Sequence, residues 1–139
     1  MTTLPVIIIG AGIGGLATAA ALNRVGLKTV IVEQAARFAR VGAGIQQSPN
    51  AMMVLRGLGL EARIREIAFK PRSSLNRDAY TGEITNEYPL GEAVEKRYAA
   101  PFFALHRADL HEALASVVPP ASLRLGHRLV GIDQDDRAV

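Results

Sequence analysis

Three glycines near the N-terminus have the spacing of a phosphate-binding turn. Gly10, Gly12 and Gly15 form a Gly-x-Gly-x-x-Gly pattern that directly follows the apolar run of residues 4–9. In such a turn the first glycine permits a tight bend, the second lets a pyrophosphate approach the backbone, and the third allows the helix to pack closely on the strand. The helix that follows would direct its N-terminal N–H groups and the positive end of its dipole at the phosphates.

An acidic residue stands where a ribose-binding carboxylate is expected. Glu33 ends a second apolar run, residues 28–32, and lies 18 positions after Gly15, close to the typical separation of about 20. Its carboxylate can accept hydrogen bonds from ribose hydroxyls and would repel a 2′-phosphate. The motif therefore predicts a dinucleotide site that disfavours NADP, and it does not by itself choose between FAD and NAD.

The elements that must position this turn surround it in the sequence. Residues 4–9 and 28–32 are apolar and rich in β-branched side chains, which predicts buried parallel strands. Residues 16–25 are rich in Ala and Leu and are followed by Gly26, which predicts a helix and its end. Together they make a βαβ unit, so we expect an α/β fold.

The remaining elements are predicted from periodicity and from turn residues. We expect a loop over 34–48, helices over 51–58 and 61–67 broken at Gly59, strands within 73–90 turning at Thr81–Gly82, an irregular stretch or short helix over 91–100, a strand over 102–105, a helix over 108–118, and a strand pair or one bent strand over 123–132.

The last residues suggest that the fold continues. Residues 133–136 are predicted to be a turn, and residues 135–139 resemble the start of a return strand. A strand without its partner would leave backbone groups unpaired. We therefore expect the chain to be the N-terminal piece of a longer protein.

Composition limits the classes of function that fit. The 139 residues are 49% hydrophobic and 21% charged, with a net charge of +3 and no Cys. This balance is typical of a folded domain, excludes disulfides and thiolate metal sites, and fits a reducing compartment. Basic residues are not clustered and aromatic residues are only 5%, so we expect no nucleic-acid surface. No positive charge precedes the uncharged stretch 6–22, so no signal peptide is expected. Glycines interrupt this stretch, so no membrane span is expected either.

The histidines do not form a recognisable metal or catalytic arrangement. His106 and His111 are five positions apart, which is not the spacing of a helical ligand pair, and His127 stands alone. The Gly-x-Ser-x-Gly pattern of α/β-hydrolases is absent from the sequence. We assign no metal site and no catalytic residue.

Three segments, in this order, resemble one enzyme family. They are residues 10–17 with Val32-Glu33-Gln34, residues 42–51 (Gly-Ala-Gly-Ile-Gln-Gln-Ser-Pro-Asn-Ala) and residues 106–111 (His-Arg-Ala-Asp-Leu-His). They resemble the FAD-binding blocks of class A flavoprotein aromatic monooxygenases, especially the salicylate hydroxylase and 6-hydroxynicotinate 3-monooxygenase branch. The resemblance implies that residues 1–139 are the N-terminal portion of a Rossmann-like, glutathione-reductase-type FAD-binding domain. The substrate domain and the C-terminal part of this larger two-domain fold would lie outside the chain.

The resemblance also implies which residues contact FAD. Arg40 is equally compatible with a solvated side chain, and Val130, on a strand that runs past the adenine in this family, with a core position. The expected cofactor-binding residues are Gly10, Gly12, Gly14, Gly15, Glu33, Gln34, Arg40, Ala43, Gly44, Arg107 and Val130.

The expectations for residues 42–44 and for Arg107 also have structural alternatives. The small residues 42–44 would let the backbone approach a flavin ring or ribityl chain, but they also suit an ordinary turn before a helix. Arg107 could reach an FAD phosphate or ribityl oxygen, or pair on the surface with Asp109 or Glu112, which would contribute little to stability.

The reaction implied by the resemblance is aromatic hydroxylation. In this family NAD(P)H reduces the flavin, and one oxygen atom of O₂ is transferred to an activated, hydroxylated ring. The expected partners are a small aromatic substrate, NAD(P)H and O₂ in the cytoplasm, and a second copy of the full-length protein in a homodimer, with no nucleic acid or membrane. The alternatives are a fragment of an NAD-linked dehydrogenase and a truncated dinucleotide-binding module without activity of its own.

One position departs from part of the family. The hydroxynicotinate hydroxylases place a catalytic His directly after the Gly-Ala-Gly-Ile segment, where this chain has Gln46. A glutamine cannot act as a general base near neutral pH. This argues against the hydroxynicotinate activity and leaves a salicylate-like or other hydroxyarene substrate open, with Gln46 as a candidate hydrogen-bonding contact.

Overall fold

The chain forms two compact units. The computed structural model describes residues 4–134. Unit 1 comprises the described residues up to Arg40 and from Leu114 onward, and unit 2 comprises residues 41–113. Helix α5 (Arg107–Ser116) begins in unit 2 and ends in unit 1. The predicted return strand over residues 135–139 lies outside the described residues.

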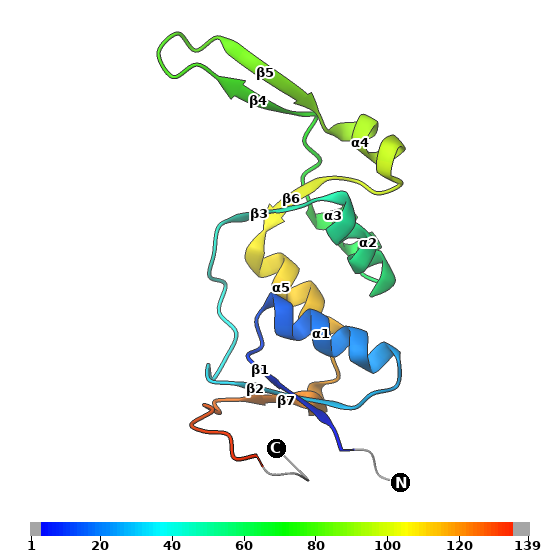
Figure 1. The fold of residues 1–139 in the computed structure, drawn as a ribbon, viewed down its shortest axis with the longest axis vertical. Helices are drawn as coiled ribbons and strands as arrows, with labels where there is room; N and C mark the ends of the chain where they lie inside the picture. Colours follow the sequence, from blue (N-terminus) through cyan, green and yellow to red (C-terminus); the bar gives the residue numbers. More distant parts are fainter. Residues whose placement is uncertain (1–3, 135–139) are drawn as a thin grey trace. The chain divides into compact units, whose positions relative to one another are not determined.

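Unit 1 contains the predicted βαβ unit (Figure 1). Its elements are β1 (Val6–Ile9), α1 (Ile13–Arg24), β2 (Thr29–Glu33), the short 3₁₀ helix η1 (Pro120–Ser122) and β7 (Leu123–Leu125). The three strands form a parallel sheet in the order β1-β2-β7, with β2 in the middle. The α/β prediction is therefore confirmed.

Helix α1 covers one face of this sheet. Its small and apolar residues Leu16 and Ala19 are fully buried, as is Ile31 at the centre of β2. In the register, Ile8 lies opposite Ile31, and alternation directs both side chains to the face covered by α1. This packing uses the Ala- and Leu-rich composition that predicted the helix.

The prediction that β1 is buried on both faces is wrong for the described residues. Ile7 is 61% and Ile9 is 51% exposed, because they lie on the face opposite α1. Within residues 4–134, β1 is also an edge strand that pairs only with β2. An apolar run predicts that a strand is suited to burial. It does not predict whether residues 4–134 include an element that covers the strand.

The predicted strand or strand pair over residues 123–132 is only partly formed. β7 has three residues, and residues 127–134 contain no helix or strand. Gly126 and His127 donate backbone hydrogen bonds to the carbonyl oxygens of Ala35 and Glu33, at 3.0 and 2.9 Å. Val130, expected on a strand, is 96% exposed and lies beyond these last pairings. Alternating apolar residues favour a strand, but a strand also needs a partner ladder.

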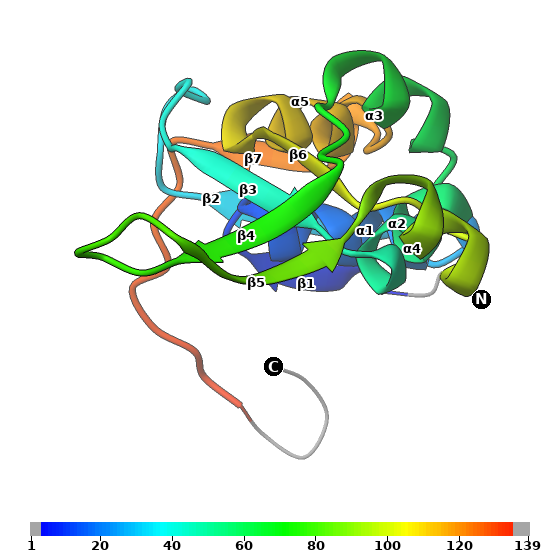
Figure 2. The same cartoon turned by 90° about the horizontal axis from the view of Figure 1, so that it is seen from above.

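Unit 2 combines helices with two antiparallel strand pairs (Figure 2). Its elements are β3 (Gly44–Gln47), α2 (Pro49–Gly57), α3 (Glu61–Ile67), β4 (Ser73–Arg77), β5 (Ile84–Pro89), α4 (Gly91–Tyr98) and β6 (Phe103–His106). β3 pairs with β6, and β4 with β5. The predicted helical hairpin around Gly59 and the strand hairpin around Thr81–Gly82 are confirmed. Of the two options for residues 91–100, an irregular stretch or a short helix, the structure forms the short helix α4.

The prediction of a loop over residues 34–48 is wrong for its last part, because β3 lies there. Gly and Gln have little intrinsic preference for strands, so the local sequence does not indicate one. β3 forms because β6, far away in the sequence, offers a complementary ladder. The core of unit 2 is built from buried apolar side chains that include Met52, Ile64 and Phe103. In the described part of the chain, no helix combines the length and the apolarity needed to cross a membrane.

Candidate functional site

The glycine turn of unit 1 has the close packing that its spacing predicts. Gly10 donates its N–H to the carbonyl of Val32 at 2.8 Å, which ties the turn to β2. A Cβ on Gly15 would lie 1.9 Å from the carbonyl oxygen of Gly10, so only glycine lets α1 pass this close to the end of β1. A Cβ on Gly12 or Gly14 would meet nothing within 4 Å. The turn is thus closely packed at Gly15 and has open space beside Gly12 and Gly14.

The start of α1 suits an anionic group. Gly12 is the N-cap residue and brings no side chain to the cap, and the first turn holds no acidic residue. The N-terminal N–H groups of a helix carry a partial positive charge and need acceptors. Phosphate oxygens are suitable acceptors at such a position, so the turn fits the diphosphate of a dinucleotide.

Glu33 links the turn to the end of β2. Its Oε2 accepts the N–H of Ala11, and its Oε1 accepts the N–H of Ala35, both at 2.8 Å. A carboxylate accepts hydrogen bonds from ribose hydroxyls as well as from N–H groups, so the chemistry of Glu33 suits a ribose. Gln34 and Arg40 follow as exposed residues of the same unit.

The unit 2 candidates lie at β3 and at the start of α5. Arg107 donates its backbone N–H to the carbonyl of Ala43 at 3.0 Å. Gly42 has a φ of +132°, and a Cβ there would lie 3.1 Å from the Cβ of Arg107. The aliphatic part of the exposed Arg107 side chain therefore packs on Gly42, which requires a glycine both for its backbone and for this contact. Glu112, one predicted surface partner of Arg107, accepts from Arg63 at 3.1 Å.

The two glutamines that end β3 have different environments. Gln46 is exposed. Gln47 is 7% exposed and donates its Nε2 to the carbonyl of Gln46 at 2.8 Å. His106, which sequence reasoning set aside, ends β6 and accepts the N–H of Ala108 on its Nδ1 at 3.2 Å. Its position between a strand and a helix was visible in the sequence, but its pairing with β3 was not, because β3 was not predicted.

The structure brings most of the predicted residues together within their own units. In unit 1, the turn glycines surround the start of α1 and are tied to Glu33. In unit 2, Ala43 accepts the backbone N–H of Arg107, and Gly44 and Gln46 lie on β3, which pairs with β6. Val130 is not on the predicted strand.

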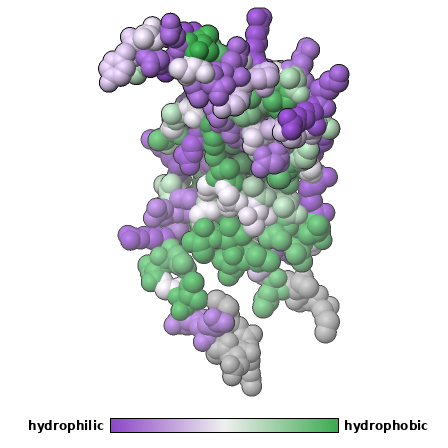
Figure 3. Space-filling model, turned by 45° about the horizontal axis from the view of Figure 1, so that its top comes forward, coloured by the Kyte–Doolittle hydropathy of each residue, from purple (hydrophilic) through white to green (hydrophobic). Residues whose placement is uncertain are grey.

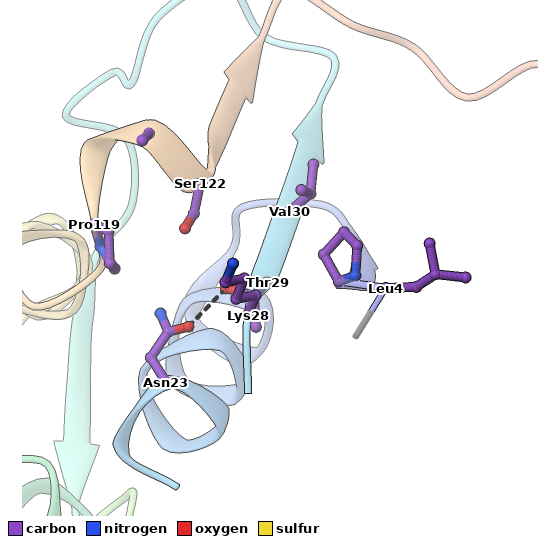
Figure 4. Close-up of a pocket in the computed structure, with 9 residues that line it drawn as sticks. Leu4, Asn23, Lys28, Thr29, Val30, Pro119 and Ser122 are labelled. Carbon is purple, nitrogen blue, oxygen red and sulfur yellow. Dashed lines mark hydrogen bonds between the residues drawn. The ribbon is translucent and has the colours of Figure 1, made fainter. Parts of the chain in front are cut away.

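A separate cavity of about 550 Å³ opens in unit 1 (Figure 4). It is lined by residues just before β1 and β2, such as Pro5 and Lys28, and by Ser122 of η1. The glycine turn follows the other end of β1, so this cavity is distinct from the turn. Asn23 accepts the hydroxyl hydrogen of Thr29 at 3.1 Å, and its buried Nδ2 has no hydrogen-bond partner within the described residues.

Comparison with known proteins identifies relatives along almost the whole chain. The 3-amino-4-hydroxybenzoate 2-monooxygenase of Streptomyces cremeus is 38% identical over 132 residues, which are 95% of this chain and 34% of the relative. The 6-hydroxynicotinate 3-monooxygenase of Bordetella bronchiseptica is 36% identical over 132 residues, with the same coverage. The 3-hydroxybenzoate 6-hydroxylase of Polaromonas naphthalenivorans is 36% identical over 139 residues, or 98% of this chain and 35% of the relative. The chain thus spans about a third of the length of these relatives.

Solved structures share the fold. HpxO of Klebsiella pneumoniae, complexed with FAD and uric acid, superposes with a TM-score of 0.81 at 28% identity, over 96% of this chain and 33% of that one. Its R204Q variant with FAD has a TM-score of 0.84 at 25% identity, over 96% and 34%. The model of the family described as "FAD binding domain" matches residues 3–139. Together with the open glycine turn and the carboxylate of Glu33, this match shows that the chain belongs to the FAD-binding domain family.

Proposed function

We propose that this chain is the FAD-binding part of an FAD-dependent monooxygenase that hydroxylates a small, hydroxylated aromatic substrate with NAD(P)H and O₂. The observation that carries the proposal is the match of 95% of the chain to relatives named as hydroxylases of ring acids. In the overall reaction one oxygen atom of O₂ enters a ring C–H bond, and the other leaves as water with the two electrons of NAD(P)H. FAD, when bound, would supply the redox chemistry between NAD(P)H, O₂ and the ring.

The residues of unit 1 would hold the adenosine diphosphate portion of FAD. The start of α1, with Gly10, Gly12, Gly14 and Gly15, would donate backbone N–H groups to the phosphates. Glu33 would accept hydrogen bonds from ribose hydroxyls while it keeps its bonds to the turn. Further contacts are proposed from the other predicted residues of this unit, Gln34, Arg40 and Val130.

The residues of unit 2 would contact the flavin portion. Ala43 and Gly44 present backbone with little side chain, which allows a flat ring to come close. The guanidinium of Arg107, held by the packing of its stem on Gly42, would bind a phosphate or ribityl oxygen. Gln46 would hydrogen-bond the substrate or the flavin, and unchanged kinetics and coupling in a Gln46→Ala enzyme would exclude that contact.

The test uses the protein expressed from its complete reading frame. We expect a yellow protein with a flavin absorption spectrum, whose oxidation of NADH or NADPH accelerates when 3-hydroxybenzoate or salicylate is added and yields a hydroxylated product. A colourless protein that takes up no added FAD would contradict the proposal. A yellow protein that forms only hydrogen peroxide with every hydroxyarene would also contradict it.

Two further features belong to this proposal. We place the enzyme in the cytoplasm, where NAD(P)H is supplied and where a sequence without Cys needs no oxidising environment. We also propose a homodimer of the full-length protein, which light scattering of the purified holoenzyme would test.

A further inference from the structure

One face of the β3–β6 pair is open and carries two polar side chains. The register places Gly44 opposite His106 and Gln46 opposite Ala104, and Figure 2 shows the two strands side by side. Because side chains alternate along a strand, these four residues share one face. Gly44 and Gln46 are exposed, and Ala104 and His106 are half-buried, whereas Phe103 at an alternate position is only 3% exposed. We call this surface the Gln46 face.

The middle of the Gln46 face carries only small residues, and one edge of this face is apolar. A Cβ on Gly44 would meet nothing within 4 Å, and Ala104 adds only a methyl group. On the other side of β6, Phe69 forms an antiparallel bridge with Ala104, with N–H···O distances of 2.7 and 2.8 Å. Residues directly opposite each other share a face, so Phe69, which is 68% exposed, forms an apolar wall beside Ala104.

The start of α5 determines which nitrogen of His106 is a donor. Nδ1 accepts the N–H of Ala108, and a neutral imidazole that accepts at one nitrogen carries its proton on the other. Nε2 of His106 therefore donates, and the amide of Gln46 offers a second donor on the same face. Diagonal neighbours on a strand pair are about 7–8 Å apart. The two donors therefore lie on neighbouring positions and can contact the same six-membered ring.

We propose that His106 is a specificity-determining residue that binds the carboxylate of an aromatic substrate through Nε2–H, while the ring lies over Ala104 against Phe69. This inference rests on the proposed hydroxylase function and adds the residue that would bind the carboxylate of a hydroxyarene carboxylate. The donors of His106 and Gln46 complement two oxygen substituents, and the small residues in the middle of the face leave room for the ring. The relatives' named substrates, 3-hydroxybenzoate, 6-hydroxynicotinate and 3-amino-4-hydroxybenzoate, are single rings that carry both an oxygen and a carboxylate.

The test distinguishes the acceptor role of Nδ1 from the donor role of Nε2 of His106, and it uses the full-length holoenzyme. His106→Asn retains an acceptor near the position of Nδ1, so α5 keeps its cap, but the donor at Nε2 is lost. His106→Gln places an amide donor near the position of Nε2 but loses the cap. Substrate dissociation constants are measured by the change in the flavin spectrum on titration with 3-hydroxybenzoate, and FAD dissociation constants by reconstitution of the apoprotein.

We expect His106→Asn to weaken 3-hydroxybenzoate binding about ten- to hundredfold, the loss of one hydrogen bond to a charged group, with the melting temperature and the FAD dissociation constant little changed. His106→Gln should recover part of the substrate affinity and lower the melting temperature. With 3-methylphenol, which has a methyl group in place of the carboxylate, the penalty of His106→Asn should disappear.

Three results would overturn the inference. They are an unchanged affinity for 3-hydroxybenzoate in His106→Asn, an equal penalty with 3-methylphenol, and a loss of FAD affinity in place of substrate affinity, which would assign the Gln46 face to the flavin. A wild-type enzyme that binds FAD and hydroxylates 3-hydroxybenzoate is the reference for all three. A wild-type enzyme that does not bind FAD or does not hydroxylate 3-hydroxybenzoate would count against the proposed function. That outcome is distinct from the three results on His106→Asn.

Discussion

Gly15 and Glu33 hold the glycine turn in shape through different interactions. Gly15 acts by what it lacks, since its missing side chain lets α1 approach the carbonyl of Gly10. Glu33 acts by what it accepts, because its two carboxylate oxygens bind the N–H groups of Ala11 and Ala35. The packing at Gly15 and the hydrogen bonds of Glu33 can therefore each be tested by a single substitution that leaves the other interaction unchanged.

Replacing Gly15 with Ala should destabilise the protein. A Cβ placed 1.9 Å from a backbone oxygen forces the helix away from the strand, which costs about 3 kcal/mol or more. The measurement is the free energy of unfolding in urea. The control is Gly57→Ala in α2, where a Cβ meets nothing within 4 Å and the change should be neutral or stabilising by up to about 1 kcal/mol. Equal effects of the two substitutions would contradict this account.

Replacing Glu33 with Gln should weaken FAD binding in the full-length enzyme. The amide retains one acceptor oxygen, so one of the two turn N–H groups loses its partner, and the charge that attracts ribose hydroxyls is gone. We expect the FAD dissociation constant to rise about ten- to hundredfold, measured by reconstitution of the apoprotein. Glu87→Gln on the exposed strand β5 is the matched control and should leave FAD binding unchanged.

Helices α2, α3 and α4 are joined by a network of charged side chains. Glu61 accepts from Arg56 and, at 2.8 Å, from Arg65. Arg65 also donates to Glu95 of α4 at 2.6 Å, and Glu95 forms a further ion pair with Lys70. Single exposed ion pairs contribute little, but members of a network restrain one another. The network thus ties the helices of unit 2 to each other.

The same network reaches the segment before β6. Arg56 donates Nη2 to the carbonyl of Ala99 at 2.9 Å. Ala99 ends α4 with a φ of 53°, an unfavourable backbone conformation for a residue with a side chain. The contact from Arg56 helps to hold this turn, after which the chain enters the strand that carries His106.

The contribution of Glu61 to stability should depend on pH. The hydrogen bond from Arg56, reinforced by Arg65 and opposed by partial burial, lowers the pKa of the Glu61 carboxyl to about 2 from an ordinary value of 4.5. A carboxyl with a depressed pKa in the folded state stabilises the protein fully above its unfolded pKa. That stabilisation is lost as the pH falls from about 4.5 towards 2.

We therefore expect Glu61→Gln to lower the free energy of unfolding by about 1 kcal/mol near neutral pH, and the difference from wild type to shrink at about pH 2.5. Urea unfolding at both pH values measures this. Glu66→Gln, an exposed position on the same helix, is the control with little effect at either pH. A difference from wild type that stays constant across this range would show that the charge of Glu61 is not responsible.

Hydrophobic residues are visible at the surface in Figure 3, where they are coloured green. In unit 1 the exposed residues include Ile7 and Ile9 on the uncovered face of the sheet, and Val130 and Ile132 after β7. Extended exposed apolar surface in a globular protein marks a place where something else binds. The relatives are about three times as long as this chain, so they contain further polypeptide that could cover such a face.

Produced as residues 1–139 alone, the chain should therefore bind a hydrophobic dye and self-associate. Changing Ile7 and Ile9 together to Thr, a good strand former, should lower both dye fluorescence and the apparent mass in light scattering. Leu75→Thr on the β4–β5 hairpin, where Leu75 is 41% exposed, is the control and should change them less. Dye binding that does not respond to the two Ile substitutions would show that this face is not the adhesive surface.

Much of unit 1 was predictable because its determinants are neighbours in the chain. The turn glycines, the Ala-rich helix and Glu33 all lie within residues 4–33, and their spacing alone implies a strand, a turn, a helix and a strand. The expected cover on both faces of β1 was not found, since burial depends on which other elements reach that face. The strand expected around Val130 failed for a related reason, because its partner ladder is not formed by the described residues.

In unit 2 the pairing of distant segments decided what the sequence left open. The motif around Gln46 was visible in the sequence, but the strand β3 was not, because Gly and Gln do not favour strands unless a partner is present. The register with β6 then placed His106 on the same face as Gln46, and the bridge from Phe69 added the apolar wall. Residue types and local spacing therefore determined the dinucleotide chemistry. Long-range backbone pairing, which local sequence does not encode, determined which side chains share the open face.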